Sequence, residues 1–598
     1  MFSARQTAAR LCALILLACA GPAAAVDVSL RAPGASPSFT DGLRAASLVV
    51  ETVQNEEATA QDVVAAARAD YARMVAYLYE AGYYGGVVSI RIDGREADSI
   101  SPIAAPSRIG RVDLVVRPGP AFAFGRAEVR PLTGETTLPE GFATGQIARA
   151  TLIGQAAREG RDGWRRAGHA KADIEDQSIS VDHRRKTLDA AIRIDPGPRL
   201  RFGNLNVEGQ STVRPGRVRA IAGLPTGQVY SPAALETAGQ RLRRTGAFRS
   251  VVLEESDTIG PGQSLDIGAT LVDAKPRRFG FGLELSSLEG LTVSGFWLHR
   301  NLLGGAERLR IEGEVGGIGG DSGGIDYRLS TRFERPATFT PETTLILGFT
   351  LQELDEPDFR ERSVRLGGGL EHIFSDTLTG EIGLAYLYSD IDDDLGSRSL
   401  EHVLLPAHLT YDSRDKPLDA RSGLYTRVEL APFVGFGGGG SGARLYADAR
   451  AYLTFPQAAR VTWAARTQVG SVNGAGLGEV PPAMLFFSGG ADTVRGQPFQ
   501  SLAVELGGGN RVGGRSFMAV SAEMRASLSD SWGFAAFADA GFVGQDSWGT
   551  SNGDWQAGAG IGVRYQTGIG PIRVDLATPL DSDAGEDFEL YIGIGQAF

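Results

Sequence analysis

The chain has 598 residues, of which 42% are hydrophobic and 80 are glycine, and its formal net charge is −12. This length allows several domains, or one large barrel with accessory modules. A net acidic chain with only four lysines and no basic stripe argues against nucleic-acid binding.

Residues 1–25 have the pattern of a secretory signal peptide. Arg5 precedes the apolar run Leu11–Ala20, and small residues then form a cleavage site. A lipoprotein box ending at Cys19 is the alternative, although the residues before it fit such a box poorly. Because Cys12 and Cys19 both lie in this segment, the rest of the chain is predicted to hold no disulfide and no thiolate metal site.

After this segment, no apolar run reaches the eighteen or more residues that a membrane-spanning helix needs. Any membrane crossing must therefore use strands. A high glycine content with moderate hydrophobicity suits a large antiparallel barrel, in which inward polar and glycine positions alternate with apolar ones.

The first half of the chain contains a repeat. Three similar stretches each carry a Phe-Gly pair, at Phe124, Phe202 and Phe279, with spacings of 78 and 77 residues. A regular spacing of this kind indicates repeated structural modules.

Each repeat also contains a helical pattern that closes on glycine, at Tyr77–Gly86, Trp164–Ile174 and Arg241–Val251. A glycine after the last helical turn can adopt the left-handed cap conformation and release the chain into a strand. We therefore expect each unit to be a small α+β module of strand, two helices, strand and strand, with an open sheet edge. A generic α+β domain with coincidental joints is the alternative.

From residue 277 onward, apolar and polar residues alternate with a period of two. In Asp554–Thr567 one face is apolar with aromatics near both ends, and the other face is polar or bare, as expected for a barrel wall. Charges such as Arg573 and Asp575 on the second face require a wet lumen. A soluble all-β domain is the alternative. Sixteen strands are predicted, at 277–285, 291–298, 307–317, 323–334, 343–353, 361–373, 378–389, 401–412, 423–434, 442–455, 461–471, 516–527, 533–543, 554–567, 569–577 and 586–598.

Several segments resemble the BamA/TamA superfamily of outer-membrane barrels, and the three repeats resemble POTRA modules. The segments are His299–Gly313, Thr410–Tyr425, Phe486–Phe499, Phe537–Gly541 and Gly570–Leu580. The number of modules, three rather than five or two, makes the chain most similar to the TamA branch of this family. The implied organisation is a signal peptide at 1–25, POTRA modules at 26–117, 118–197 and 198–275, and a barrel at 276–598 with an in-folded loop at about 472–515.

In this family a long external loop folds into the lumen and carries a Val-Arg-Gly-aromatic motif. Val494, Arg495 and Gly496 match it, whereas Gln497 replaces the aromatic residue and Phe499 is the alternative source of the ring. The resemblance implies that Asp539, with Glu523 on the preceding strand as a second acceptor, binds the arginine. An arginine inside a barrel needs a fixed carboxylate with matching fork geometry, so we expect Arg495 to bridge the two. A solvated surface arginine is the alternative.

The resemblance also implies a weakly paired seam between the first and last barrel strands, Arg277–Leu285 and Glu586–Phe598. The residues assigned to this seam are Phe279, Gly280, Gly593, Gly595 and Phe598. Glycines interrupt side-chain packing in a strand. Phe598, at the end of the last strand, resembles the signal that such barrels present to their assembly machinery.

The function implied is assembly or translocation of other outer-membrane or autotransporter proteins, with client strands adding to the edges of the POTRA sheets. The expected location is the bacterial outer membrane, with the modules in the periplasm and a TamB-like periplasm-spanning partner. No cofactor or metal is implied, and none of the six histidines lies in a recognisable catalytic context. A two-partner-secretion transporter that threads one client through the lumen is the main alternative, and an enzyme or a passive porin is the third.

Overall fold

The computed structural model describes residues 26–55, 57–101, 103, 105–286, 290–320, 323–455, 460–568, 570–580 and 588–598. The predicted signal peptide lies outside the described residues. The chain divides into two compact units. One contains the residues up to Gly203 with Thr226–Ala233 and Thr258–Leu265, and the other contains Asn204–Pro225, Ala234–Asp257 and Asp266–Phe598.

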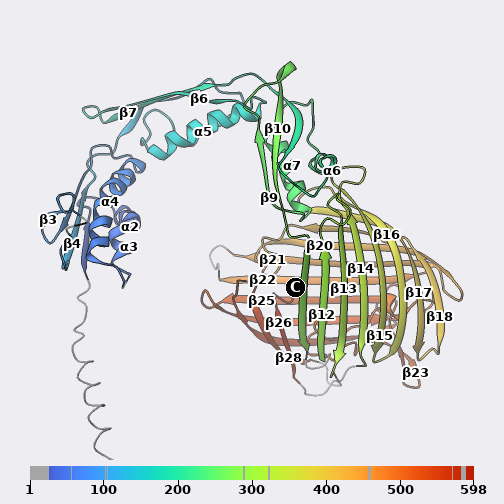
Figure 1. Ribbon diagram of the computed structural model, residues 1–598. Coiled ribbons are helices and arrows are strands. Elements are labelled where there is room, and N and C mark those ends of the chain that lie inside the picture. Colours follow the sequence, from blue (N-terminus) through green and yellow to red (C-terminus); the bar gives the residue numbers. More distant parts are fainter. Residues whose placement is uncertain are drawn as a thin grey trace, which may run out of the picture. The chain divides into compact units, whose positions relative to one another are not determined.

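The first module packs helices against one face of a four-stranded sheet with the order β1-β4-β2-β3 (Figure 1). Apolar side chains from both layers, among them Leu43, Met74, Ile90 and Leu114, are fully buried between them. Burial of this kind is the main favourable contribution to folding. Its elements are β1 (Asp27–Arg31), α2 (Pro37–Ala46), α3 (Leu48–Thr52), α4 (Ala60–Glu80), β2 (Val87–Ile92), β3 (Arg95–Glu96) and β4 (Arg111–Arg117).

A buried carboxylate fixes the helices of this module to one another. Asp70 of α4 accepts hydrogen bonds from the Ser47 hydroxyl at 2.5 Å and from the backbone N–H groups of Leu48 and Val49 at 2.7 and 3.1 Å. The first N–H groups of a helix have no partner within the helix. Asp70 therefore caps the start of α3 from a neighbouring helix.

Two further three-stranded sheets follow, with the orders β5-β7-β6 and β8-β10-β9. The first belongs to β5 (Ala123–Arg130), α5 (Ala150–Arg166), β6 (Asp173–Asp182) and β7 (Thr187–Asp195). The second belongs to β8 (Arg201–Glu208), α6 (Pro215–Ala222), α7 (Pro232–Arg244), β9 (Phe248–Glu255) and β10 (Ser264–Asp273).

The expected order of strand, two helices, strand and strand holds for the third module. It is wrong for the first module, where three helices and an additional short strand are described, and for the second, where the described residues contain one long helix, α5. Between β5 and α5, residues 131–149 form turns and irregular structure. Pro131, Pro139 and three glycines interrupt this segment, and both residue types disfavour a continuous helix.

The predicted glycine caps are present in all three modules. Gly82, Gly168 and Gly246 follow α4, α5 and α7 and have φ values of +90°, +100° and +68°. A residue with a side chain is strained at such angles, which explains why glycine ends each helix.

The repeated Phe-Gly pair has two different environments. Phe124 and Phe202 are each 1% exposed inside their modules, whereas Phe279 is 66% exposed on β11 (Arg277–Ser286). The third copy therefore begins the barrel wall, and its phenylalanine faces outward instead of packing in a module core.

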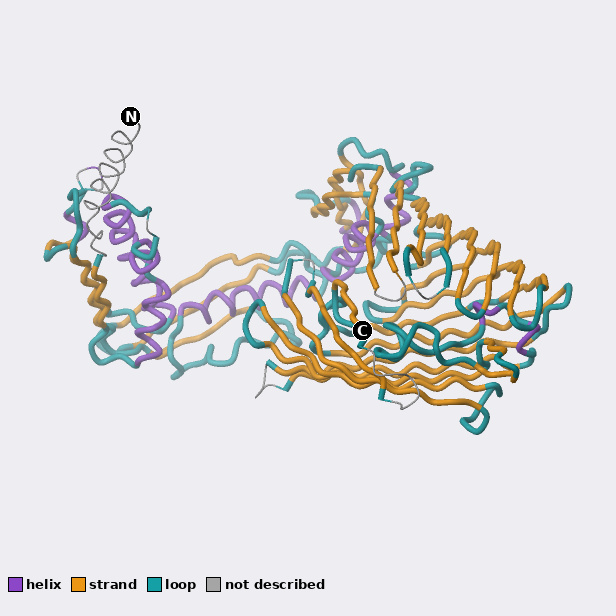
Figure 2. Tube along the Cα trace, turned by 90° about the horizontal axis from the view of Figure 1, so that it is seen from below, coloured by secondary structure: helices purple, strands orange, loops and turns teal. Residues whose placement is uncertain are grey.

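The second half of the chain is a closed antiparallel barrel (Figures 1 and 2). β18 (Arg398–Leu404) and β19 (Ala407–Asp412) both pair with β17 and β20, so they are one strand interrupted at residues 405 and 406. Counted in this way, the described residues form sixteen strands, as predicted. The others are β11, β12 (Gly290–His299), β13 (Arg308–Ile318), β14 (Asp326–Arg335), β15 (Thr343–Glu356), β16 (Phe359–Ile373), β17 (Leu378–Asp393), β20 (Gly423–Phe436), β21 (Gly442–Thr454), β22 (Val461–Asn473), β25 (Ser516–Ser527), β26 (Trp532–Gly544), β27 (Gly553–Tyr565), β28 (Ile572–Pro579) and β29 (Glu589–Ile594).

The wall alternates as the period of two predicts. On β27, Ile561 and Val563 are exposed on the outer face, whereas Arg564 between Val563 and Tyr565 is buried inside. Among the described helices, none is both long enough and apolar enough to cross a bilayer.

The last predicted strand, 586–598, extends too far at its C-terminal end. Residues 586 and 587 lie outside the described part of the chain, and β29 ends at Ile594. Gly595 has a φ of +92°, which an extended strand does not allow, and it turns the chain out of the wall. The marked C-terminal end lies within the outline of the barrel in both views (Figures 1 and 2).

Candidate functional site

The segment between β22 and β25 folds back into the barrel and has a core of its own. Val480, Leu485 and Phe486 of this segment are buried against Phe517 of β25 and Val472 of β22. The segment also contains a small hairpin of β23 (Val504–Gly507) and β24 (Asn510–Val512). It is therefore a packed structure that contacts several strands of the wall.

Arg495 projects from this loop onto two carboxylates of the wall. Its Nε and one terminal nitrogen donate to the two oxygens of Asp539 at 2.7 and 3.0 Å, and its other terminal nitrogen donates to Glu523 at 2.9 Å. The backbone N–H of Arg495 also donates to Asp539 at 3.1 Å. All three side chains are at most 3% exposed. The forked contact with Asp539 has the geometry that makes such pairs strong.

The aromatic contact differs from the expectation. The ring beside Arg495 belongs to Phe537, whose centroid lies 3.5 Å from the guanidinium carbon. Gln497, at the usual aromatic position, donates instead to the carbonyl of Ala557 at 2.8 Å. Phe537 is two residues before Asp539 on β26, so one strand supplies both the carboxylate and the ring.

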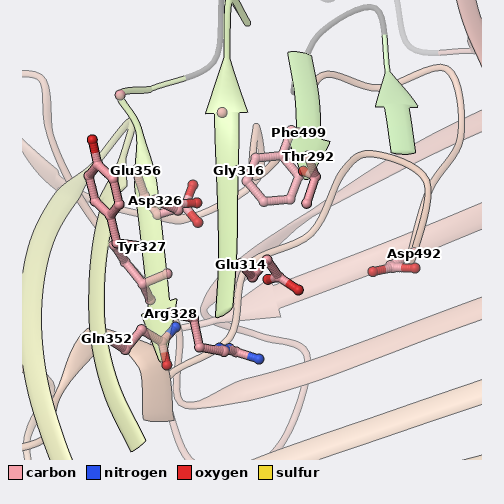
Figure 3. A pocket seen from close by; sticks show the side chains of 13 residues that line it. Thr292, Glu314, Gly316, Asp326, Tyr327, Arg328, Gln352, Glu356, Asp492 and Phe499 are labelled. Carbon is pink, nitrogen blue, oxygen red and sulfur yellow. The ribbon is translucent and has the colours of Figure 1, made fainter. Parts of the chain in front are cut away.

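Phe499, the expected source of the ring, lies elsewhere. Together with Asp492 of the loop it lines a cavity of 370 Å³ whose opposite wall carries Glu314, Asp326 and Arg328 (Figure 3). Phe499 therefore lines a cavity with residues of strands β12 to β15, and the ring beside Arg495 comes from Phe537 instead.

Glu523 connects Arg495 to a larger buried network. One oxygen of Glu523 receives Arg495, and the other receives Arg525 at 2.8 Å and Arg564 at 3.4 Å. Arg564 also binds Asp575 of β28. Removing one member of such a network leaves its partners buried with uncompensated charge.

The same network holds the residues that follow β29. Arg525 donates to the carbonyl oxygen of Phe598 at 3.0 Å, and Arg564 donates to the side chain of Gln596 at 2.8 Å. The ring of Phe598 is buried with Tyr452 and Ala464. The loop arginine and the inward-turned tail therefore share Glu523 through two neighbouring arginines.

Two glycines let the loop backbone approach the wall closely. A Cβ at Gly558 would lie 2.1 Å from the carbonyl oxygen of Arg495, and a Cβ at Gly496 would lie 2.6 Å from backbone atoms of Thr578. Gly496 also donates its N–H to the hydroxyl of Tyr591, on β29, at 3.1 Å. Side chains at these glycines would displace the loop.

The seam between the first and last strands is short. Within the described residues, β11 pairs with β29 only at Leu285 with Ile592 and at Ser286 with Tyr591, whereas it pairs with β12 from Arg277 to Ser286. Gly593 stays within β29 and pairs with Arg573 of β28.

Sequence reasoning brought Arg495, Glu523 and Asp539 together but missed the rest of the network. Phe537 opens one of the segments that resemble the family, but nothing in the sequence indicated its contact with Arg495. Arg525 and Tyr591 carried no usable signal, because each lies in an ordinary alternating strand. Arg564 and Asp575 stood on the polar face of predicted strands, which was a signal for a lumen position but not for a contact. Among the described residues, no cluster of histidine, cysteine and acidic side chains is arranged to hold a metal ion.

Comparisons with known proteins find similarity over both halves of the chain. A model of the Omp85 superfamily domain matches residues 301–598, and a POTRA model, described as a surface antigen variable number repeat, matches residues 200–267. The chain is 25% identical over 456 residues to the outer membrane protein assembly factor BamA of Nitratidesulfovibrio vulgaris, covering 71% of this chain and 54% of that protein. The chain thus spans about half the length of this relative.

Two solved structures share the fold. The BamA structure from Haemophilus ducreyi lacking POTRA domains 1-3 has a TM-score of 0.63 at 17% identity, covering 79% of this chain and 100% of that chain. CdiB from Acinetobacter baumannii has a TM-score of 0.50 at 12% identity, covering 79% of this chain and 89% of that chain.

Proposed function

Because the chain belongs to the Omp85 superfamily, we propose that it assembles client proteins into the outer membrane through the seam between β11 and β29. The chain is an outer-membrane barrel with periplasmic POTRA modules, and this role requires no catalytic group. On this proposal, residues 26–117, 118–197 and 198–275 are three modules that meet clients before the barrel does.

The observation that carries the proposal is the unpaired edge of β11. The two seam pairs set a register in which Gly282 would stand opposite Gly595 and Phe279 opposite Phe598. The tail turns inward at Gly595 instead, so the edge from Arg277 to Gly282 has no strand beside it among the described residues. Unpaired backbone groups at the level of a bilayer are costly, which favours pairing with an incoming strand.

The side chains along this edge point into the lipid. Phe281 is 88% exposed and Leu283 is also exposed, on the same outward face as Phe279. A client strand that pairs with β11 would place its own apolar residues beside them, because side chains of neighbouring strands align across a ladder. The edge thus offers hydrogen bonds and an apolar surface together.

The periplasmic modules offer a second kind of edge. β6 is the outermost strand of the sheet β5-β7-β6, and its residues are exposed along almost its whole length. An extended client segment can add to such an edge by main-chain hydrogen bonds. We propose that clients are held in this way before they reach the seam.

We further propose that the chain is TamA-like, with autotransporters among its clients and a TamB-like periplasm-spanning protein as its partner. The presence of three module sheets before the barrel supports this assignment. The two-partner-secretion alternative would thread its client through the lumen. The packed loop around Arg495 lies inside the barrel and favours the lateral route instead.

A disulfide across the seam tests the proposal. Leu285 and Ile592 stand directly opposite each other, and opposed residues of antiparallel strands have a Cα separation that a disulfide spans. Both cysteines of the chain lie within the predicted signal peptide, so the double variant L285C/I592C has a clean background. Oxidation should abolish insertion of a β-barrel client into vesicles, and reduction should restore it.

The matched control is V293C/V315C, which locks the neighbouring pair β12–β13 at opposed positions. This lock should leave insertion unchanged, because those strands already pair along most of their length, with one irregularity between Leu291 and Val293. Equal insertion by the oxidised and reduced seam variants would defeat the lateral route while leaving the fold assignment intact.

A further inference from the structure

A groove of 560 Å³ lies on the outer face of the barrel, where β16, β17, β19 and β20 run side by side. The apolar residues that line it, including Ile382, Leu409 and Leu430, are exposed, and they alternate along their strands with lumen-facing residues such as His408. The groove is therefore continuous with the surface that the barrel presents to lipid.

Two small residues form its floor. Across the strands, Gly380 stands between His372 and Leu409, and in the next outward row Ala407 stands between Ile382 and Leu430. Ala407 also directly follows the break between β18 and β19. The interrupted strand and the missing side chain at Gly380 therefore both contribute to the depression in this part of the outer surface.

One end of the groove is polar. His372 Nδ1 lies 2.8 Å from the hydroxyl of Thr343, and the His372 ring packs 4.8 Å from that of Phe374. His372 is one residue before the end of β16, and Thr343 is the first residue of β15. Since β11 directly follows the periplasmic modules, these strand ends face the periplasm. The polar end therefore lies at the level of the lipid headgroups.

We propose that this groove binds one phospholipid of the periplasmic leaflet. An acyl chain lies over Gly380 and Ala407, and a phosphate or ester oxygen of the headgroup meets His372. When Nδ1 accepts the threonine hydroxyl, Nε2 carries the ring hydrogen and can donate it, and the described residues offer Nε2 no protein partner. The site is independent of the seam and of client assembly.

Packing rather than the hydrophobic effect makes the site selective. Lipid tails are as apolar as the wall, so association within a bilayer depends on van der Waals contact and on hydrogen bonds. A chain in a concave groove touches protein on several sides, whereas a chain on the flat wall touches it on one. The hydrogen bond at His372 then distinguishes a phospholipid from a hydrocarbon chain that lacks an oxygen-bearing headgroup.

The test fills the groove by Gly380→Leu. A Cβ at Gly380 would lie 2.9 Å from Leu409 Cδ2 and 3.0 Å from Phe374 Cε2, both ends of movable side chains, so the backbone need not shift. Full-length protein is reconstituted in vesicles of phosphatidylethanolamine and phosphatidylglycerol, extracted in mild detergent and analysed by native mass spectrometry. The wild-type chain should retain one phospholipid, and the variant should show about tenfold lower occupancy.

The matched control is Gly313→Leu. Gly313 is a lipid-facing glycine of β13, opposite the exposed Leu329, and no atom lies within 4 Å of an added Cβ. This variant should retain lipid as the wild type does. Equal retention in the G380L and G313L variants, or no stoichiometric lipid on the wild-type chain, would overturn the proposal and leave only annular lipid.

Two further variants keep the test decisive. Ala407→Leu fills the neighbouring row if G380L does not fold, as judged by heat-modifiable migration of the barrel. His372→Phe keeps a ring but removes the hydrogen bond, and it should lower retention of both phospholipids, because both carry the phosphate and ester oxygens that His372 meets. Retention in the H372F variant equal to that of the wild-type chain would remove His372 from the site.

Discussion

Arg495 joins the in-folded loop to the barrel wall through ion pairs that are buried away from water. Its partners Glu523 and Asp539 are almost completely buried and are held on adjacent strands, β25 and β26. A buried ion pair contributes little net stability by itself, but breaking one is expensive because a bare charge remains. We therefore propose that Arg495 latches the loop, a structural role rather than a catalytic one.

Replacing this arginine should release the loop. Arg495→Ala removes the forked partner of the buried Asp539 and one of the three arginines around Glu523, at a cost of roughly 3–5 kcal/mol. The expected result is faster proteolysis of residues 472–515 and a lower temperature for loss of heat-modifiable migration. Arg495→Lys should give an intermediate result, because a lysine cannot reproduce the fork.

The control for this prediction is Arg310→Ala. Arg310 also pairs with a carboxylate of the lumen, Glu312, at 2.8 Å, but both side chains are about one-third exposed. Water can compensate that loss, so the effect should be below about 1 kcal/mol. Similar protease sensitivity in the R310A and R495A variants would contradict the latch.

At the scale of elements, the tail after β29 decides whether the seam is open. Gly595 is the hinge, since its φ of +92° is available to glycine and strained for other residues. A Cβ there would meet only Leu418, at ordinary contact distance, so a substitution acts through backbone strain and not through a clash.

Gly595→Val should therefore straighten the tail. Strain of about 1–3 kcal/mol opposes the turn, and a β-branched residue favours the extended conformation. The tail would then lie along β11, where Gly282 stands opposite residue 595 in the seam register. Amide hydrogen exchange over residues 277–282 should slow, and client insertion should fall. Gly593→Ala is the control, because Gly593 is already extended within β29 and its replacement should change neither measurement.

At the scale of the whole molecule, the last module is tied to the barrel by an ion pair. Arg241 and Arg244 of α7 both bind Glu342, in the turn before β15, with Arg241 Nε at 2.6 Å. Burial alone would raise the pKa of Glu342, but the hydrogen bonds from the two arginines outweigh it and lower the pKa below its ordinary value. The pair is therefore complete at neutral pH and above the ordinary glutamate pKa, and it weakens as pH falls through the lowered value.

Glu342→Ala should loosen α7 without disturbing the barrel. The pair is partly exposed, so we expect a loss on the order of 1 kcal/mol. Hydrogen exchange at the C-terminal end of α7 should rise in the full chain, while heat-modifiable migration stays unchanged. Asp376→Ala, in the turn between β16 and β17, removes a carboxylate without an ion pair among the described residues and should change neither readout.

Much of the wall and the module plan followed from the sequence. A period of two with an outward apolar face has few solutions other than a barrel, and strand boundaries fell within a few residues of those observed. Glycine after each long helix predicted Gly82, Gly168 and Gly246 as caps, because few other residues tolerate their φ values. These are local properties, which the neighbouring residues alone determine.

Only the tertiary structure decided which distant charged residues contact one another. Glu523 could be placed in the lumen from its strand, but its contacts with Arg525 and Arg564, and through them with Phe598 and Gln596, depend on how sixteen strands close into a ring. The inward tail likewise arises only when the first and last strands meet. The lipid-facing groove arises only when the interrupted strand of β18 and β19 pairs between β17 and β20. Sequence periodicity assigns each side chain to a face, whereas closure of the barrel fixes which side chains stand opposite one another.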